Sequence, residues 1–237
     1  GIKSLRTKMV GYYAEYGIDL SPDEIIITTG GSEAIMFAYM ACLNPGDEII
    51  VTDPSYANYM AFAISCGAIV KSVKTDIEHG FRLPSVEEFE KQITDKTRAI
   101  LICNPNNPTG GIFTKKELDK VLNRIPESVI IVMDEAYGEY VTSEDYPDSL
   151  ELIKTYPNMI ILKTLSKAYG LASLRFGYGI ANEEIVDYIN RVINSFDVNL
   201  FAQKAALVAI EDDEFINKVR VYNKEQREFL SFEFEKM

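Results

Sequence analysis

The chain has 237 residues, 47% hydrophobic and 25% charged, which is ordinary for a globular protein and long enough for one large domain or two small ones. Its formal net charge of −12 argues against nucleic acid and anionic membranes as main partners, so a phosphate ligand would need a local pocket. A single histidine and the lack of a long apolar run argue against a zinc site, a histidine-based triad and a transmembrane anchor.

The first half of the chain alternates between helical and extended patterns. Apolar side chains recur at helical spacing from Leu5 to Tyr16, which predicts a helix over residues 3–16 that stops at Gly17. Short β-branched and apolar runs predict strands over 24–29, 48–52, 68–73 and 98–103. Helices are expected over 32–43 and 57–65, a short extended piece over 81–84, and a further helix from the capping box at 85–88.

The second half continues the alternation and then becomes helical. A second capping box at 114–117 opens a helix, and apolar runs predict strands over 129–133, 159–162 and 176–180. Helices are expected over 183–193 and 201–210, followed by a charged helical run from Glu214 onward. We therefore expect an exit helix over roughly residues 212–237, that is, a final helix that leads away from the sheet and has no strand partner.

Seven short apolar strands with helices between them predict an α/β fold. Near-continuous apolar strands such as 129–132 indicate a mostly parallel sheet that is covered on both faces, in a three-layer α/β/α arrangement. No internal repeat, low-complexity tract or linker divides the chain, so we expect one domain over residues 1–237.

The carboxyl ends of strands in an open α/β sheet are where ligands bind, so the residues that follow each strand matter most. The first strand is followed by Gly30, Gly31 and Ser32, which open a helix whose free N–H groups could hold a phosphate. A plain strand–helix turn is the commoner interpretation of this pattern. Tyr56 follows the second strand and could stack on a planar ring, or it could be an ordinary core or rim aromatic.

The fourth and fifth strands are followed by more specific groups. The loop 104–110 contains two prolines and could present the Asn107 amide inward, although Asn-Pro turns are common. Asp134 comes directly after an apolar strand, so it is partly desolvated and favours a cationic partner such as a protonated pyridine nitrogen. Tyr137 could then bond a phenolic oxygen on the same ring; alternatively, Asp134 is a helix N-cap.

The sixth strand is followed by two hydroxyls, an amine and a guanidinium, carried by Thr164, Ser166, Lys167 and Arg175. The hydroxyls and the guanidinium could hold a phosphate, and the lysine could form a Schiff base with a carbonyl. Arg175 reaches the same side only if the segment loops back. A strand-to-loop junction with surface charges is an equally good interpretation of this segment alone.

The segment 164–167, Thr-Leu-Ser-Lys, followed by Leu171-Ala172, Leu174-Arg175 and Gly177-Tyr178, resembles the lysine signature of pyridoxal-phosphate enzymes of the aspartate aminotransferase fold, near the histidinol-phosphate aminotransferase branch. Ser173 departs from this pattern, because that branch usually has glycine there. The order of the motifs matches fold-type I aminotransferases along essentially the whole chain. Residues 22–110 look nearer to aspartate aminotransferase-like enzymes, and 134–186 look nearer to the histidinol-phosphate branch.

The resemblance implies a role for each matched residue. Lys167 would be the Schiff-base lysine, Asp134 would pair with the pyridine nitrogen, and Tyr137 would assist in holding the ring's phenolic oxygen. The full set implied to bind pyridoxal 5'-phosphate is Gly31, Ser32, Tyr56, Asn107, Asp134, Tyr137, Thr164, Ser166, Lys167 and Arg175. Tyr56 would cover the ring, Asn107 would join Tyr137, and the remaining residues would hold the phosphate.

The activity implied by the resemblance is amino-group transfer between an amino acid or histidinol phosphate and a 2-oxo acid, in amino-acid biosynthesis. A domain that binds the cofactor with little turnover, and a related decarboxylase or lyase, remain alternatives. A dinucleotide-binding domain is the least supported of these alternatives, because no predicted strand–turn–helix unit carries Gly-x-Gly-x-x-Gly. The resemblance covers only the large domain, so the small domain is expected to be absent and the chain is expected to form a homodimer.

The three cysteines are Cys42, Cys66 and Cys103, an odd number set in separate apolar segments. Such cysteines are typical of buried thiols in a reducing compartment, and they do not have the spacing of a metal site or a disulfide framework. No signal-peptide pattern opens the sequence, so we expect a cytoplasmic protein.

Overall fold

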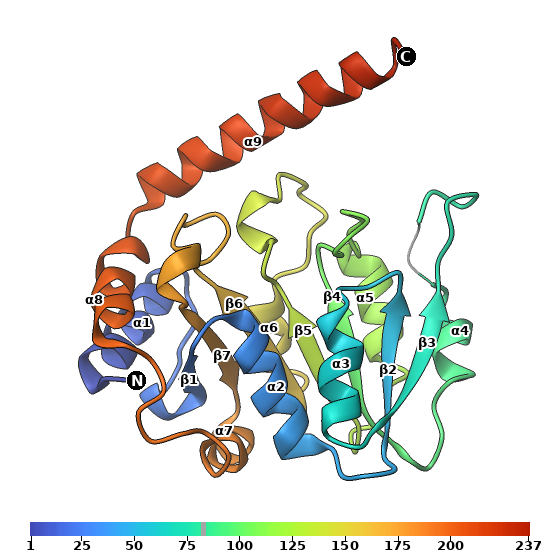
Figure 1. The fold of residues 1–237 in the computed structure, drawn as a ribbon, viewed down its shortest axis with the longest axis horizontal. Helices are drawn as coiled ribbons and strands as arrows, with labels where there is room; N and C mark the ends of the chain where they lie inside the picture. The colour runs from blue at the N-terminus through green and yellow to red at the C-terminus, as the bar shows by residue number, and fades with distance from the viewer. Residues whose placement is uncertain (82–83) are drawn as a thin grey trace.

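The structure is a computed structural model that describes residues 1–81 and 84–237. Its centre is a seven-stranded sheet in the order β1-β7-β6-β5-β4-β2-β3 (Figure 1). The strands are β1 Ile25–Thr28, β2 Glu48–Asp53, β3 Ile69–Lys74, β4 Thr97–Cys103, β5 Ile130–Asp134, β6 Met159–Thr164 and β7 Gly177–Ala181. Each of the seven predicted strands is present. The expected extended piece at 81–84 falls on residues 82–83, which lie outside the described residues.

β7 runs against both of its neighbours, and all the other pairs in the sheet are parallel. The predicted mostly parallel sheet is therefore confirmed. Because β7 is reversed, its first residue, Gly177, lies opposite Thr164, the last residue of β6. The loop between these strands thus returns to the edge of the sheet at which the parallel strands end.

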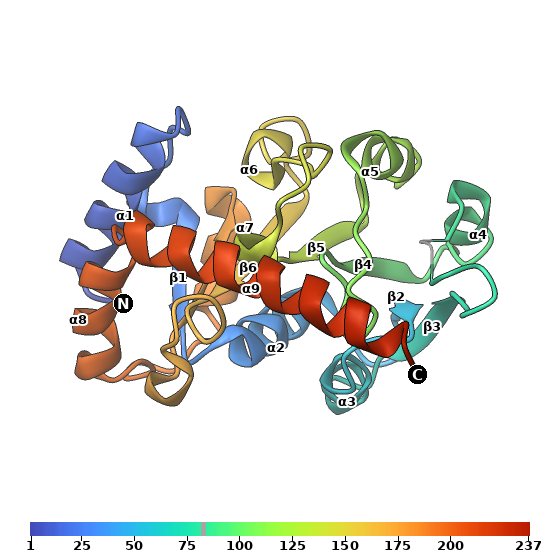
Figure 2. The same ribbon diagram turned by 90° about the horizontal axis from the view of Figure 1, so that it is seen from above.

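The two faces of the sheet pack into two separate apolar cores. Ile100 and Ile102 of β4 belong to one core, whereas Leu101 between them belongs to the other, as the alternation of side chains along a strand requires. Figure 2 shows α2 and α3 on one side of the sheet and α4, α5 and α6 on the other. The predicted three-layer α/β/α architecture is confirmed, and it explains why the central strands are apolar on both faces.

The helices follow the sequence pattern closely. They are α1 Lys3–Glu15, α2 Gly31–Cys42, α3 Asn58–Ser65, α4 Val86–Glu90, α5 Lys115–Leu122, α6 Ser149–Leu152, α7 Glu183–Asn190, α8 Leu200–Ala209 and α9 Asp213–Phe234. Both predicted capping boxes form, at Ser85 and at Thr114. The four-residue α6 was not predicted, because its start depends on one side-chain cap from Asp148 and it is too short to show a helical period.

The last helix, α9, lies above the edge of the sheet at which the parallel strands end (Figure 1). Its first part is attached to the site region, because Arg220 Nε donates a hydrogen bond of 2.9 Å to the carbonyl of Glu139. Farther along, Phe229 and Phe234 are exposed. Within residues 1–81 and 84–237, no helix combines the length and the hydropathy needed to cross a membrane.

All three cysteines are unpaired. Cys103 is buried at the end of β4, and burial raises the pKa of its thiol to about 12. Cys42 and Cys66 are only partly covered, so the expectation of buried thiols is met by Cys103 alone. Burial nevertheless raises the pKa of Cys42 to about 12. Thiols with such raised pKa values are poor nucleophiles, so these side chains act as packing groups.

Candidate active site

A cavity of about 190 Å³ opens at the carboxyl edge of the sheet. It is lined by every residue that the sequence singled out, namely Gly31, Ser32, Tyr56, Asn107, Asp134, Tyr137, Thr164, Ser166, Lys167 and Arg175. These residues come from separate loops that follow different strands, and the parallel order of the strands brings those loops together. The structure also adds Ile35, Tyr59, Ala136 and Lys163, which were not predicted.

One end of the cavity is formed by the turn between β1 and α2. Gly30 has a φ of +85°, a conformation that glycine adopts without steric cost. A Cβ atom on Gly30 would lie 2.6 Å from Nη2 of Arg175, so the guanidinium packs directly on this turn. The first N–H groups of α2, at Gly31 and Ser32, have no acceptor within the helix. Together with Arg175 they form a positively polarised corner suited to an anion.

The hydroxyls of Thr164 and Ser166 complete this corner. Thr164 Oγ1 lies 2.9 Å from the carbonyl of Phe176 and 3.0 Å from Ser166 Oγ, and it accepts from the Ser166 N–H at 3.2 Å. The two strands that meet here are antiparallel, so the segment after Thr164 and the segment before Gly177 lie side by side. This is the loop-back on which the predicted place of Arg175 depended.

The departure at Ser173 does not disturb this turn. The left-handed conformation falls on Arg175, with a φ of +59°, and Ser173 lies in the short helical turn Ala172–Leu174. Arg175 Nη1 also donates to the carbonyl of Ala172 at 2.9 Å, which helps to hold the turn closed. The position therefore needs no residue with the conformational freedom of glycine.

Gly177 is required at its position, and we expect Gly177→Ala to be destabilising. A Cβ atom there would lie 2.4 Å from the carbonyl carbon of Gly30 and 2.6 Å from the nitrogen of Gly31, so the backbone of the turn would have to move. Overpacking of this kind costs about 1–3 kcal/mol or more. Urea unfolding measures the loss, and Gly11→Ala in α1 is the matched control, because that site is open. Equal stability of the two variants would contradict the steric argument.

Asp134, the last residue of β5, also lines the cavity. Its side chain is buried, with Oδ2 accepting from the Tyr59 hydroxyl at 2.6 Å and Oδ1 accepting from the N–H of Ala136 at 3.0 Å. Burial raises the pKa of Asp134, and these two donors oppose the rise. Both donors are neutral, so the carboxylate still favours a cationic group within the cavity.

Tyr59 is the principal residue that the sequence did not reveal. It lies in the first turn of α3, and its ring contacts the ring of Tyr56 edge-on at a centroid distance of 5.5 Å. Burial beside Asp134 raises the pKa of Tyr59 well above its usual value, so the phenol remains a donor. Tyr56 precedes α3 and Tyr59 lies within it, so no helical spacing in the sequence linked Tyr59 to the site.

Asn107 and Tyr137 meet across the middle of the cavity. Asn107 Nδ2 donates to the Tyr137 hydroxyl at 3.0 Å, so an oxygen of a bound molecule could meet both side chains. Lys167 Nζ lies 5.1 Å from the centre of the Tyr137 ring. The Lys167 side chain is exposed at the mouth, and no carboxylate among the described residues lies within ion-pair distance of its amine.

Lys163, four positions earlier, differs sharply from Lys167. Its side chain is only 14% exposed, and Nζ lies 3.1 Å from Glu135 Oε2 and 3.3 Å from Glu139 Oε1. Burial by itself lowers the pKa of Lys163, but Glu139 and Glu135 outweigh burial and raise that pKa well above its usual value. Lys163 therefore stays an ammonium ion, and Lys167 is the amine available to a ligand.

The cavity thus offers an anion corner, a buried carboxylate, an amide, a phenol and an accessible amine. These groups suit a planar cationic ring that carries a phosphate and a carbonyl, because one cavity holds both a buried carboxylate without a cationic partner and a corner suited to an anion. The residues present are therefore compatible with pyridoxal 5'-phosphate.

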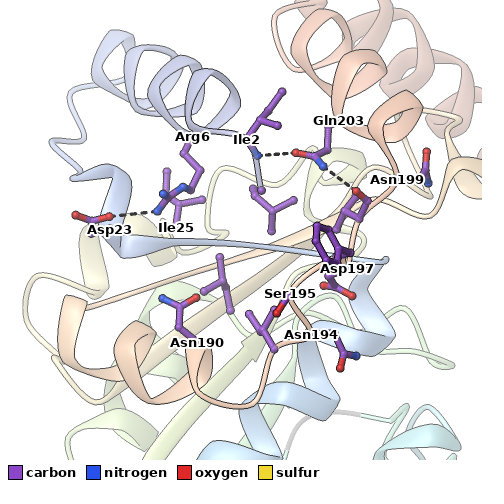
Figure 3. Close-up of a pocket in the computed structure, with 16 residues that line it drawn as sticks. Ile2, Arg6, Asp23, Ile25, Asn190, Asn194, Ser195, Asp197, Asn199 and Gln203 are labelled. Atoms are coloured by element: carbon purple, nitrogen blue, oxygen red, sulfur yellow. Dashed lines mark hydrogen bonds and ion pairs between the residues drawn. The ribbon is translucent and has the colours of Figure 1, made fainter.

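A second, larger cavity of about 690 Å³ lies beside β1 and contains none of these groups (Figure 3). Gln203 accepts from the Ile2 N–H at 2.6 Å and donates to Val198, and Arg6 pairs with Asp23 at 3.2 Å. Burial and the nearby Glu33 raise the pKa of Asp197 in this cavity to about 6. These contacts join the start of α1 to α8, and α1 to the turn Pro22–Glu24 before β1.

Comparison with known proteins places this geometry in a family. The family model for aminotransferase class I and II matches residues 1–237. Histidinol-phosphate aminotransferase 2 of Carboxydothermus hydrogenoformans is 42% identical over 225 residues, which is 94% of this chain and 60% of that protein. The histidinol-phosphate aminotransferase of Caldicellulosiruptor saccharolyticus is 40% identical over 93% of this chain and 60% of its own length. The similarity to this group extends through both halves of the chain.

Solved structures of aspartate aminotransferases are also similar to this chain. An aspartate aminotransferase from Thermotoga maritima superposes with a TM-score of 0.92 at 31% identity, covering 100% of this chain and 63% of that one. The aspartate aminotransferase from Thermus thermophilus with maleate gives a TM-score of 0.88 at 28% identity, over 97% of this chain and 62% of that one. The chain thus spans about 60% of the length of the curated relatives that it matches.

Proposed function

Because the chain belongs to the class I and II aminotransferases, we propose that it binds pyridoxal 5'-phosphate and transfers amino groups between an amino acid and a 2-oxo acid. The observation that carries this proposal is the convergence of Lys167, Asp134 and the Gly31–Arg175 corner on one cavity. An amine, a buried carboxylate and an anion site are the three groups that this chemistry requires, and here they come from three different strand ends.

Pyridoxal 5'-phosphate supplies, when bound, an aldehyde that condenses with amines and a ring that withdraws electrons from the neighbouring carbon. Arg175, Thr164, Ser166 and the α2 N-terminus would hold its phosphate. Asp134 would face the ring nitrogen and keep a proton on it, since a buried carboxylate is best satisfied by a cation. Asn107 and Tyr137 would bond the ring's phenolic oxygen, and Tyr56 would cover one face of the ring.

Lys167 would bind the aldehyde carbon and would also carry the substrate's proton. Asp134 has both oxygens engaged, and no histidine lines the cavity. The Lys167 amine is therefore the base placed to take the proton from the substrate's α-carbon and to return it. Its exposure at the mouth of the cavity lets an incoming amino acid reach it directly.

Histidinol phosphate is the amino donor that the relatives' names support. Two proteins named for that substrate are 42% and 40% identical to this chain over more than nine-tenths of its length. We further propose that residues 1–237 form a cofactor-binding domain, with residues from about 212 leading toward a small domain. The length of the relatives and the projection of α9 support this arrangement.

A homodimer in the cytoplasm is the assembly and the location that we propose. Exposed aromatic side chains such as Phe196 and Phe201 support contact with a second copy. The unpaired state of the three cysteines supports a reducing compartment.

A second candidate is a domain that binds the cofactor with little turnover. The observation in its favour is that the one guanidinium lining the cavity, within the part of the chain that the structure describes, is that of Arg175. That side chain packs on the Gly30 turn, so it is not free to bind the α-carboxylate of a substrate as well. A related decarboxylase or lyase would use the same cofactor residues.

Absorbance spectroscopy separates these candidates. We expect the purified chain with pyridoxal 5'-phosphate to develop a visible absorption band that is absent in Lys167→Ala. Adding histidinol phosphate or glutamate should shift the band if the chain transfers amino groups. An unresponsive band would identify the low-turnover binding domain, and the absence of any band would refute the proposed function.

A further inference from the structure

The segment that carries Tyr137 has little regular structure to hold it. It follows β5 and continues into the short turn Gly138–Tyr140, so it has no strand partner and no helix of more than three residues. Its internal backbone bonds are Gly138 N–H to the Glu135 carbonyl at 3.0 Å, Tyr140 N–H to the Tyr137 carbonyl at 3.1 Å and Val141 N–H to the Gly138 carbonyl at 3.1 Å. Other contacts must therefore fix the direction of the Tyr137 side chain.

Lys163 contacts this segment on both sides of Tyr137. Glu135 lies two residues before Tyr137 and Glu139 lies two residues after it, and the two carboxylates approach the same ammonium at 3.1 Å and 3.3 Å. A Cβ atom on Gly138 would lie only 3.7 Å from Lys163 Nζ, so the segment folds closely around the ammonium. A single cation thus ties both flanks of Tyr137 to β6.

Both glutamates are in turn held by neighbouring elements, Glu135 through its carboxylate and its backbone N–H, and Glu139 through its backbone carbonyl. Ser149 of α6 donates to Glu135 Oε1, and the Glu135 N–H donates to the Leu162 carbonyl at 2.9 Å. The carbonyl of Glu139 accepts from Arg220 of α9 at 2.9 Å. These bonds join the segment after β5 to β6, α6 and α9, beside the cavity that Lys163 lines.

Stability alone gives a weak reason for such a cluster. The side chains of Lys163, Glu135 and Glu139 are only 14%, 5% and 14% exposed, so three charges have been removed from water. Apolar groups of similar volume often stabilise a core as well as or better than buried ion pairs do. Charges that fix one geometry are useful where a neighbouring group must be placed accurately.

We propose that Lys163 is a positioning residue that sets the Tyr137 hydroxyl against Asn107 by clamping Glu135 and Glu139 on either side of Tyr137. The significance of this position for catalysis rests on the proposed function, because Tyr137 and Asn107 would meet the ring of the cofactor. The mechanical part of the proposal concerns this chain alone and can be tested without any ligand.

A double-mutant cycle tests the functional part. Lys163→Met and Tyr137→Phe are each expected to lower kcat/KM by about tenfold and to shift the pH dependence of the bound cofactor's absorbance, within the usual range for coupled residues. The double variant should be no worse than either single variant, because Lys163 acts through the Tyr137 hydroxyl. Lys163→Arg should restore most of the activity. Additive losses would overturn the proposal, since they would mean that Lys163 affects the enzyme by another route.

Hydrogen exchange tests the mechanical part in cofactor-free protein. Amides of residues 136–141 should exchange at least tenfold faster in Lys163→Met, whereas the core strands stay protected. Lys154→Met is the matched control, since it removes the same charge from an exposed pair with Glu151 at 3.3 Å. Unchanged exchange in Lys163→Met would overturn the clamp whether or not the chain binds cofactor, so this failure is distinct from failure of the proposed function.

A paired variant covers the case in which Lys163→Met does not fold. Lys163→Met combined with Glu139→Gln removes the cation together with one of its two carboxylates and keeps the net charge of the cluster. This variant should fold and should still show fast exchange at residues 136–141. A folded paired variant with wild-type exchange would refute the clamp.

Discussion

Lys167→Ala is expected to abolish covalent retention of the cofactor and to lower amino-transfer activity by about ten-thousandfold, the upper end of the range for loss of an acid–base group. The expected loss is large because one side chain would perform two tasks, binding the aldehyde carbon and moving the proton of the substrate's α-carbon. Lys163 also lines the cavity, but its ammonium is paired with Glu135 and Glu139, so it is not available to replace Lys167.

Borohydride reduction followed by peptide mass spectrometry measures this directly. The modified peptide should carry Lys167 in the wild type, and no modified peptide should appear in the variant. Lys154→Ala is the control, because that side chain is a surface lysine paired with Glu151. Recovery of the label on Lys163 or Lys154 would show that the assignment of Lys167 is wrong.

Asp134→Asn is expected to keep the cofactor but to lower turnover by about a hundredfold to a thousandfold, as loss of a preorganised electrostatic contact usually does. The amide preserves the shape and the hydrogen bond with Tyr59, but it removes the charge that would hold a proton on the ring nitrogen. Single-turnover rates with one amino acid measure the effect, and Tyr59→Phe serves as a comparison that leaves the charge in place. Unchanged single-turnover rates in Asp134→Asn would contradict this role.

Asp134→Asn should lower turnover, but it should raise the stability of the cofactor-free protein relative to the wild type as pH rises. Burial raises the pKa of Asp134 from its ordinary value of 3.8, so its contribution to stability is full below that value and is lost as pH rises through the folded-state pKa. The substituted amide carries no charge at any pH, so the Asp134→Asn variant should gain on the wild type as pH rises from about 4 to about 7. Urea unfolding across that range checks the sign.

The strand ends could be predicted because they depend on local pattern and on one geometric rule. Apolar runs located the strands, and the parallel order placed Gly31, Asp134 and Lys167 along one edge. The place of Arg175 could be predicted only by assuming that the chain loops back after β6. The antiparallel pairing of β7 with β6 provides this loop. These inferences needed no knowledge of how individual side chains pack.

The residues that escaped prediction depend on contacts between distant segments. Tyr59 reaches Asp134 only because α3 packs against the same face of the sheet, and nothing local to either residue indicates the pairing. Lys163 looked like an ordinary lysine near the end of a strand, yet it is enclosed by two carboxylates from the loop after β5. Tertiary packing determines the surroundings of both Tyr59 and Lys163, and the sequence of a single element does not reveal that packing.

The reversed strand β7 also has a consequence for the order in which the molecule can assemble. Ile25 of β1, near the start of the chain, pairs with Ile180 of β7, far along it, so their contact closes a very long loop. Closing such a loop costs chain entropy that only later contacts recover, which makes it a slow step. The Gly30 turn meets Arg175 only after this closure. Before this closure, a nascent chain would therefore lack the Gly30–Arg175 corner that suits an anion, even where its other strands had formed.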